Sequence, residues 1–311
     1  MMMMNETSSY TIEEVAGLLK VSKLTVYDLI KKGVLPAYRV GRQMRVDEED
    51  LKQYKTNMRM SQPIAAKEAP KQVQEAEPDG RPNVMISGQD ISMDILSKHL
   101  ENAIQETPLR KYKGSLNSLI DMYQGKCDIV SLHLYDAETG QYNAPYVKRI
   151  LTGEPFCLIN VVLRKAGLYV QKGNPKNIQG WKDLKRADIR IINREKGSGA
   201  RVLLDEQLGL LGVNPADVVG YGDIVTDHYA AASQVSSGQA DAGIGAQHAA
   251  HMGSVDFIPL IDEQYDIVVL KKNEQLLKAV KEILNSEDYK ANLSHLNGYE
   301  TKLTGKVILE T

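Results

Sequence analysis

Two short stretches near the start of the chain place apolar residues at helical spacing. Thr11 and Glu14 have the spacing of a capping box, and an apolar helix face follows them. Ser22 predicts the start of a second helix over residues 23–32, and Gly33 predicts its left-handed end. Two short helices joined by a tight turn are typical of a helix-turn-helix.

A hairpin and a third helix are predicted directly behind this pair. Residues 37–40 and 43–46 have strand character and flank a turn that contains Gly41. Asp47 predicts the start of a helix over residues 48–54. The hairpin would be the wing of an α+β winged helix-turn-helix.

From residue 83 onward, strand and helix patterns alternate. The strands are expected at residues 84–86, 127–132, 189–192 and 242–244, and helices are expected to start at Ser92 and Ala200. This alternation predicts an α/β domain with a largely parallel sheet and crossover helices. In such sheets ligands bind beyond the carboxyl ends of the strands, so the loops there are the candidate site.

The segment between the two patterns has a different composition. Residues 56–82 hold four prolines and almost no large apolar side chains, which predicts a flexible linker. The expected domains are therefore residues 9–55 and 83–311, joined by residues 56–82. A length of 311 residues, with 42% hydrophobic residues and a net charge of -2, fits a globular chain of about two domains.

Basic charge is concentrated in the front domain. Between residues 23 and 45 there are six bases and one acid, whereas the whole chain has an excess of acids. Such a concentration of positive charge predicts phosphate contacts on double-stranded DNA, with the start of the second helix in the major groove. The residues expected to contact DNA are Ser22, Lys23, Thr25, Tyr27, Lys31, Arg39, Arg42, Gln43 and Arg45.

Two points about this domain stay open at the level of the sequence. The charges have an alternative explanation, which is that they only solvate a small helical domain. If the domain does bind DNA, its small contact area favours a homodimer on two half-sites.

The segment VSKLTVYDLIKKGVLPAYRVGRQMRVDEEDL closely resembles the excisionase-like winged helix-turn-helix family. The resemblance covers nearly all of residues 9–55 and implies DNA binding. Asp28 stands where the family often has a basic residue, which leaves the sequence preference open.

Four loops of the large domain each place a hydroxyl group at a predicted helix start. They are residues 86–89, 113–116, 196–201 and 225–228, and three of them have an adjacent glycine. Glycine permits close backbone approach, and the free amides and dipole of a helix start favour an anion. Helix capping alone would explain any single loop, whereas four such loops favour a shared site.

The segments 170–175, 181–184, 193–201 and 237–245 are similar to periplasmic-binding-protein-like sensor domains that are fused to such winged heads in bacterial regulators. That resemblance implies two α/β lobes with a ligand in the cleft, and related domains are associated with molybdate and tungstate. The cleft residues expected from the loops and this resemblance are Ser87, Gly88, Ser115, Ser198, Gly199, Arg201, Thr226 and His228. Arg201 would either bind a carboxylate with its planar fork or brace its own loop.

For five residues near these loops, the sequence does not decide between the cleft entrance and the outer surface. His133, Tyr135, Asp136, Tyr146 and Arg149 would line the cleft entrance or the outer surface.

Together these features predict a transcriptional regulator that senses a small anion, molybdate or tungstate. Two alternatives are an architectural DNA binder with a non-sensing body, and a carrier or enzyme of the molybdopterin pathway. No cofactor and no metal are expected, because Cys127 and Cys157 lack zinc-site spacing and only His248 and His251 lie close together. No catalytic motif is present, so an enzyme is not expected. The sequence shows neither a leader nor a long apolar run, so we expect a cytoplasmic protein without a membrane partner.

Overall fold

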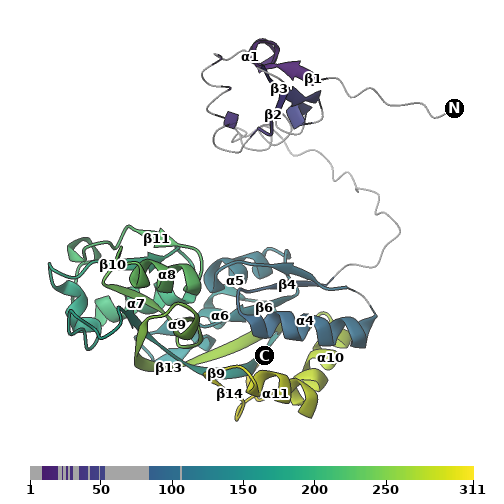
Figure 1. Ribbon diagram of the computed structural model, residues 1–311. Coiled ribbons are helices and arrows are strands. Elements are labelled where there is room, and N and C mark those ends of the chain that lie inside the picture. Colours follow the sequence, from purple (N-terminus) through teal and green to yellow (C-terminus); the bar gives the residue numbers. More distant parts are fainter. Residues whose placement is uncertain are drawn as a thin grey trace. The chain divides into compact units, whose positions relative to one another are not determined.

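The structure is a computed structural model that describes residues 9–19, 23, 26, 29–30, 35–40, 43–48, 50–52, 84–105 and 107–311. The chain divides into two compact units, residues 1–78 and 79–311 (Figure 1). The predicted linker, residues 56–82, lies outside the described residues. Each unit is therefore considered by itself.

The first unit contains a small sheet and a helix. Its elements are β1 (Ser9–Thr11), α1 (Ile12–Leu19), β2 (Tyr38–Val40) and β3 (Gln43–Asp47), with the strands in the order β1-β3-β2. The capping box is confirmed: the Thr11 amide donates to Glu14 Oε2 at 2.8 Å, and the Glu14 amide donates to Thr11 Oγ1 at 3.3 Å. The described residues of the predicted second and third helices, 23, 26, 29–30, 48 and 50–52, are helical.

The predicted hairpin is also confirmed, because β2 and β3 pair in antiparallel register with Val40 opposite Gln43. Strand β1, which was not predicted, adds a third strand by pairing with β3. Helix α1 packs its apolar face onto a buried cluster that includes Val15, Val26, Leu35 and Val46. These contacts bring the helices and the hairpin onto one core, as a winged helix-turn-helix requires.

The second unit has two lobes. The first lobe contains β4 (Met85–Ser87), α4 (Ile91–Ile104), β5 (Leu109–Lys111), α5 (Ser115–Tyr123), β6 (Ile129–Leu132), β7 (Tyr135–Asp136), β8 (Gln141–Tyr142), α6 (Ala144–Ile150), α10 (Glu274–Asn285), α11 (Glu287–Ser294), β14 (Tyr299–Glu300) and β15 (Val307–Glu310). The second lobe contains η1 (Trp181–Lys185), β10 (Ile191–Arg194), α7 (Gly199–Leu210), η2 (Pro215–Asp217), β11 (Ile224–Val225), α8 (His228–Ser236), β12 (Ala242–Ala246) and α9 (His248–Met252). The predicted strands correspond to β4, β6, β10 and β12, and the predicted helices to α4 and α7.

Two long strands, β9 (Phe156–Val170) and β13 (Asp256–Leu270), join the lobes. The sheet order is β11-β10-β12-β9-β13-β6-β4-β5, with β14 and β15 also paired to β9. Strands β4, β5 and β6 are mutually parallel, as are β10, β11 and β12, whereas β9 and β13 run antiparallel to each other and to their neighbours. Figure 1 shows both strands running from one lobe into the other.

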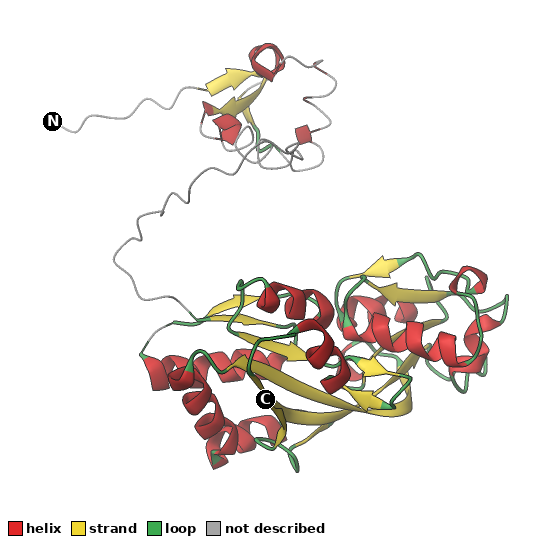
Figure 2. Ribbon diagram, turned by 180° about the vertical axis from the view of Figure 1, so that it is seen from behind, coloured by secondary structure: helices red, strands yellow, loops and turns green. Residues whose placement is uncertain are grey.

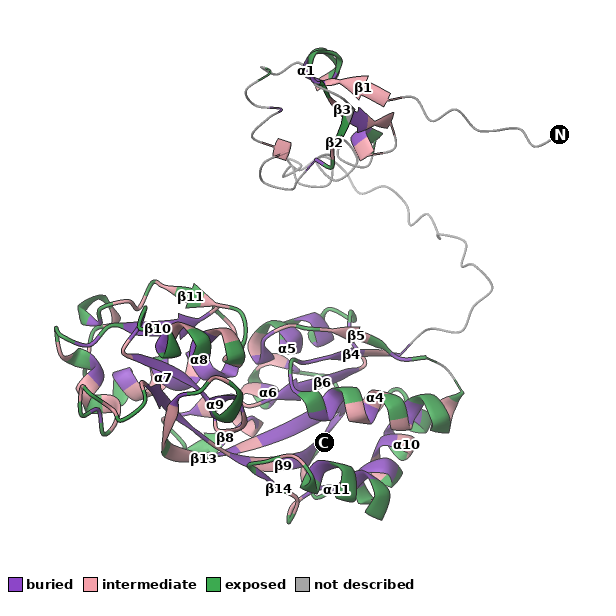
Figure 3. Ribbon diagram, viewed as in Figure 1, coloured by how far each residue is buried: buried purple, intermediate pink, exposed green. Residues whose placement is uncertain are grey.

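Helices cover both faces of this sheet in each lobe (Figure 2). The alternation of side chains along β9 explains the layering, because Ile159 and Val161 enter the core under α4 and α10 while Leu158 enters the opposite core under α5 and α6. The central strands of the sheet are largely buried, and the outer helix faces are exposed (Figure 3). Burial on both faces gives β9 a nearly continuous apolar sequence, so it lacks the alternation that marks a strand. Among the described residues, no helix is long and apolar enough to cross a membrane.

Candidate functional site

A cavity of about 250 Å³ lies between the two lobes of the second unit. Both lobes and both long strands contribute to its wall. The lining residues are Gln89, Asp90, Ile91, Asp94, Lys113, Gly114, Ser115, Ser131, His133, Arg164, Asp227, His228, Tyr229, His248 and Tyr265.

Three helices begin at the cavity wall. Asp90 caps α4 by accepting from the Ser92 amide, and Asp227 caps α8 by accepting from the Ala230 amide. Helix α5 begins after Gly114, which supplies no side-chain cap. Because the positive ends of three helix dipoles meet at one space, the cavity favours a negatively charged ligand.

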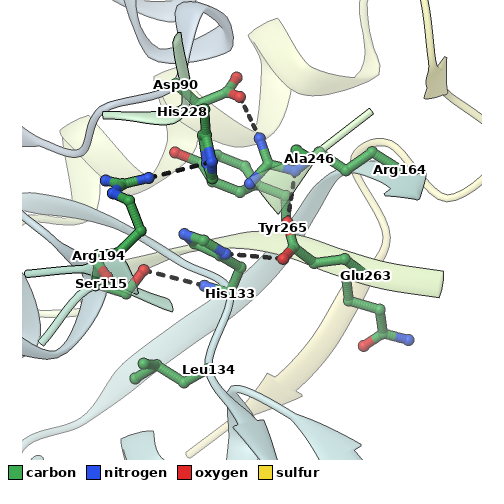
Figure 4. A network of polar contacts seen from close by, with 12 residues as sticks. Asp90, Ser115, His133, Leu134, Arg164, Arg194, His228, Ala246, Glu263 and Tyr265 are labelled. Carbon is green, nitrogen blue, oxygen red and sulfur yellow. Dashed lines mark hydrogen bonds and ion pairs between the residues drawn. The ribbon is translucent and has the colours of Figure 1, made fainter. Parts of the chain in front are cut away.

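Arg164 of β9 is buried in the cavity wall between two carboxylates. Its Nη1 donates to Asp90 Oδ2, and its Nε donates to Glu263 Oε1 at 2.5 Å (Figure 4). The guanidinium carbon lies 4.5 Å from the centre of the Tyr265 ring, so the cation also has an aromatic neighbour. These contacts hold Arg164 in one orientation.

The two carboxylates remain ionised although both are buried. Burial opposes ionisation of Glu263, but the charge of Arg164 and the hydrogen bonds from His133 and Arg164 outweigh it and lower its pKa to about 2. Burial likewise opposes ionisation of Asp90, whose pKa is nevertheless lowered by Arg164, by His248 and by hydrogen bonds from Ser92 and Tyr299. The buried group of one arginine and two carboxylates therefore carries a net charge of -1.

Two of the three histidines in the cavity have hydrogen-bond partners. His133 Nδ1 lies 2.9 Å from Glu263 Oε2 and donates to it, because an ionised carboxylate only accepts. His228 Nδ1 accepts from Arg194 Nη1 at 3.1 Å, which places the proton of the neutral ring on Nε2. Burial, followed by the charges of Arg194 and Arg164, holds the pKa of His228 well below its usual range.

His248 is the third cavity histidine, and its Nδ1 is buried without a hydrogen-bond partner. Its ring lies edge-on to the His228 ring, with 5.9 Å between the ring centres, and 5.6 Å from the Tyr299 ring. Burial lowers its pKa to about 4, with a further contribution from Arg164, so the ring is neutral near pH 7. Within the described part of the chain, no group of three or more His, Cys, Asp or Glu residues has an arrangement suited to a metal ion.

The lobes are in direct contact on one side of the cavity. Gln89 of the first lobe accepts from Arg194 Nη2 at 2.8 Å and donates to Glu195 Oε1 at 3.2 Å. Nearby, the Leu116 amide donates to the Gly197 carbonyl at 2.8 Å. The described arrangement is therefore a closed one, in which a ligand would be enclosed.

Of the predicted cleft residues, the structure brings Ser115 and His228 to the cavity. Ser115 Oγ accepts from the His133 amide at 3.3 Å (Figure 4). Ser87 lies behind the wall, where its Oγ shares a hydrogen bond with Ser118 Oγ at 2.8 Å. Gly88 also lies behind it, where an added Cβ would meet the Ser131 side chain.

The remaining predicted cleft residues lie around the loop that opens α7 and the turn before α8. Ser198 caps α7, Gly199 packs against His133, and the Thr226 carbonyl accepts from Arg194 Nη2 at 2.8 Å. None of these three lines the 250 Å³ cavity.

Arg201 braces its own loop. Its Nε lies 3.1 Å from both carboxylate oxygens of Asp205, its Nη1 donates to the Arg194 carbonyl at 3.3 Å, and its guanidinium carbon lies 4.1 Å from the centre of the Tyr221 ring. The side chain does not line the cavity. Of the two interpretations of Arg201, the geometry favours the brace.

Among the residues assigned to the cleft entrance or surface, only His133 lines the cavity. Tyr146 instead donates to Glu206, and Arg149 is exposed beside Asp136. His251, the sequence neighbour of His248, is exposed.

Arg164, Asp90 and Glu263 are not among the residues predicted from the sequence. Arg164 and Glu263 each interrupt a long apolar run, and a charged residue inside a buried strand is a signal that would have marked them. Asp90 could not be recognised as a site residue, because a carboxylate at a helix start is also expected of an ordinary cap.

In the first unit, four predicted DNA-contacting residues are described. Arg39 and Gln43 are exposed on the hairpin. Lys23 forms an ion pair with Glu13, and Arg45 Nη1 donates to Ser9 Oγ at 3.2 Å. The other predicted contacts, Ser22, Thr25, Tyr27, Lys31 and Arg42, lie outside the described residues.

Comparisons with known protein families match both units. A family model described as a PBP superfamily domain matches residues 97–285, and one described as a helix-turn-helix domain matches residues 9–59. An uncharacterized Clostridium pasteurianum protein, named for its place in the 5′ region of a ferredoxin 2Fe-2S gene, is 38% identical over 112 residues, which are 35% of this chain and 99% of that protein. A Mycobacterium tuberculosis protein provisionally named as DNA-binding is 56% identical over 41 residues, covering 13% of this chain and 53% of its own length.

Solved structures similar to this chain have the two-lobed fold of periplasmic binding proteins. A substrate-binding protein from Clostridium perfringens, named for phosphate transport and solved with phosphate bound, is 16% identical with a TM-score of 0.51, covering 70% of this chain and 98% of its own. The tungstate ABC transporter structure from Geobacter sulfurreducens is 11% identical with a TM-score of 0.53, covering 69% and 98%. At these identities the similarity establishes the fold and does not identify a ligand.

Proposed function

We propose a function for this chain, which belongs to the PBP superfamily and carries an excisionase-like helix-turn-helix domain in front of its PBP-like domain. The protein is a DNA-binding transcriptional regulator whose PBP-like domain senses a small anion, molybdate or tungstate. Because its target is DNA, it acts in the cytoplasm. Both matched domains are of binding types, so the function is recognition and not catalysis.

The observation that carries this proposal is the meeting of α4, α5 and α8 at one enclosed cavity. Two of these helices belong to the first lobe and one to the second. An anion in the cavity therefore interacts favourably with both lobes at once and stabilises their closed arrangement.

The size and donors of the cavity favour a small oxyanion. Its volume of about 250 Å³ is below the roughly 300–1,000 Å³ typical of pockets for drug-sized ligands. Ser115 supplies a hydroxyl donor and His228 supplies Nε2–H, so neutral groups can bind the anion beside the cationic Arg164. We assign Ser115 and His228 as ligand contacts, and Ser87, Gly88, Ser198, Gly199, Arg201 and Thr226 as residues that shape and support the surrounding loops.

Ligand binding would control DNA binding by shifting the balance between open and closed lobes. Gln89 contacts Arg194 and Glu195 only across the lobe boundary, so these hydrogen bonds belong to the closed form. A ligand changes DNA affinity to the extent that it binds the two forms unequally. We propose that the protein acts as a homodimer and that closure alters the pairing of its sensor domains.

Calorimetry of the full chain with molybdate, tungstate, sulfate, phosphate and small carboxylates tests the ligand. Micromolar binding of molybdate or tungstate is expected, with a large loss in Ser115→Ala. Ser237→Ala removes a hydroxyl from an exposed serine outside the cavity and is the matched control. Absence of binding to every anion of the panel would contradict the sensing function and leave an architectural DNA binder as the remaining explanation.

Salt-dependent DNA binding tests the proposed interface. Changing Arg39 and Arg42 to alanine should weaken binding and reduce the slope of log K against log salt by about 0.9 for each phosphate that is no longer neutralised. Arg190→Ala changes an exposed arginine of the second unit and should leave the slope unchanged. Equal slopes for the double variant and the natural protein would contradict the placement of DNA against the hairpin.

A further inference from the structure

The charge of the cavity wall poses a problem for the anion proposed above. Arg164, Asp90 and Glu263 together leave one buried negative charge at the wall. Among the other charged lining groups, Asp94 pairs with Arg110, and Lys113 shares the Asp121 carboxylate with Lys111. The single positive charge that the two lysines leave over is offset by Asp227, the helix cap of α8. A dianion would therefore enter a space that already has excess negative charge.

Only the three imidazoles in the wall can supply positive charge by taking up a proton near neutral pH. His228 is prevented from doing so by its hydrogen bond. Its Nδ1 accepts from Arg194 Nη1, and a protonated ring would place two donors against each other beside a fixed cation. His228 therefore stays a neutral donor.

His133 can accept a proton and keep its present hydrogen bond. Its Nδ1 already donates to Glu263, so protonation at Nε2 strengthens that hydrogen bond by charge. The other groups that face it are the Tyr265 ring at 5.6 Å, the His228 ring at 6.4 Å, and the backbone of Gly199. Glu263, which also holds the Arg164 guanidinium, is the charged neighbour in direct contact with the ring.

His248 has an unused nitrogen in the same wall. Its Nδ1 is buried without a partner, and its ring faces His228 and Tyr229 of α8 and Tyr299 of β14. The charged groups around it are Arg164 of β9, Glu263 of β13 and Asp90 at the start of α4, and His133 is a further titratable neighbour. Desolvation favours the neutral ring, whereas an anion placed beside it favours the charged form.

We infer that a dianionic ligand enters the cavity together with a proton that His133 and His248 take up from solvent. The inference rests on the proposed anion-sensing function and adds its regulation: the protein responds to the anion and to pH together. No bond is made or broken other than the N–H bond of the imidazolium. Where one full proton is coupled, the dissociation constant falls about tenfold for each unit of decrease in pH.

Calorimetry of the full chain with tungstate near pH 7, in buffers of different ionisation enthalpy, measures the protons taken up on binding. Tungstate is the probe because it remains a dianion near neutral pH, whereas phosphate itself titrates there. We expect the natural protein to take up close to one proton, and the double variant His133→Gln, His248→Gln to take up almost none.

Two further histidine variants serve as controls. His251→Gln changes an exposed histidine on the same short helix as His248 and should leave both affinity and proton uptake unchanged. His228→Gln should weaken tungstate binding but leave the proton uptake unchanged, because His228 stays neutral.

The possible results separate this inference from the proposed function. Binding of tungstate without proton uptake by the natural protein overturns the inference and leaves the sensing function standing. Full uptake in the double variant overturns the assignment to His133 and His248. Failure of the natural protein to bind any anion of the panel contradicts the proposed function itself.

Discussion

Replacing Arg164 by methionine removes the charge at the centre of the cavity wall while retaining a side chain of similar length. The variant leaves Asp90 and Glu263 buried without their shared cation. Glu263 keeps its hydrogen bond from His133, and Asp90 keeps those from Ser92 and Tyr299. The expected result is a strongly destabilised second unit.

The magnitude follows from the pKa of Glu263 and from the general cost of breaking a buried ion pair. The pKa of Glu263 falls from 4.5 to about 2 despite the opposing effect of burial, which corresponds to about 3 kcal/mol of interaction with its charged form. Removing one partner of a buried ion pair costs about 3–5 kcal/mol. We therefore expect Arg164→Met to lower the free energy of unfolding by about 3–5 kcal/mol.

Urea unfolding of the full chain, followed by tryptophan fluorescence, measures this loss. The chain has one tryptophan, Trp181, which packs against the core of the second lobe, so the signal reports on the second unit. Arg190→Met is the matched control, because the exposed Arg190 forms an ion pair with Asp223 at the surface and its removal should leave the midpoint unchanged.

The pH dependence gives a second, independent readout. In the natural protein the pKa of Glu263 is depressed, so its stabilising contribution is present above about pH 4.5 and is lost as the pH falls toward 2. Without Arg164, burial raises the pKa of both carboxyls, and the variant should recover stability as the pH falls below neutral. A loss under about 1 kcal/mol with no such recovery would refute the reasoning, because exposed pairs behave in that way.

Three other changes test separate parts of the structure. Gly114→Ala should hold the lobes apart, because its Cβ would lie 2.8 Å from the Gly197 carbonyl oxygen. Small-angle scattering should then show a larger radius of gyration for the variant. An unchanged radius together with unchanged ligand affinity would contradict this. Burial raises the pKa of the Asp266 carboxyl from 3.8 to about 6, so the protonated carboxyl stabilises the fold fully below pH 3.8 and this stabilisation is lost as the pH rises through 6. In urea unfolding, the free energy of unfolding of Asp266→Asn should gain up to about 3 kcal/mol relative to the natural protein between about pH 4 and pH 7. A difference that does not depend on pH would count against this. Thr11→Ala removes half of the capping box and should destabilise helix α1 by about 1 kcal/mol, measured by hydrogen exchange of its amides; unchanged exchange would show that Glu14 is sufficient.

Local features of this protein were predictable because they depend on neighbouring residues. The capping box at Thr11, the hairpin around Gly41 and the start of α4 each need only a few consecutive side chains with suitable donors, acceptors or backbone freedom. The motifs that resemble the two families also lie in short segments. They were sufficient to predict a winged helix-turn-helix followed by a two-lobed domain, and the family comparisons agree.

The long strands β9 and β13 were not predictable from pattern alone. Buried residues on both faces remove the alternation of apolar and polar positions that identifies a strand. The same strands carry Arg164 and Glu263, so the centre of the cavity wall was missed with them. Arg201 was singled out because its motif is conspicuous, but Asp205 and Tyr221 draw its side chain away from the cavity.

By itself, the sequence determined the order of the two domains, many of their local elements and the presence of helix starts suited to an anion, because caps, turns and periodicity act over a few residues. Only the tertiary structure decided which of those starts share a space. Arg164 contacts Asp90 and Glu263 across 74 and 99 residues of chain, and that meeting depends on the register of two long strands. Register arises from packing over the whole sheet, and therefore no short segment of the sequence contains it.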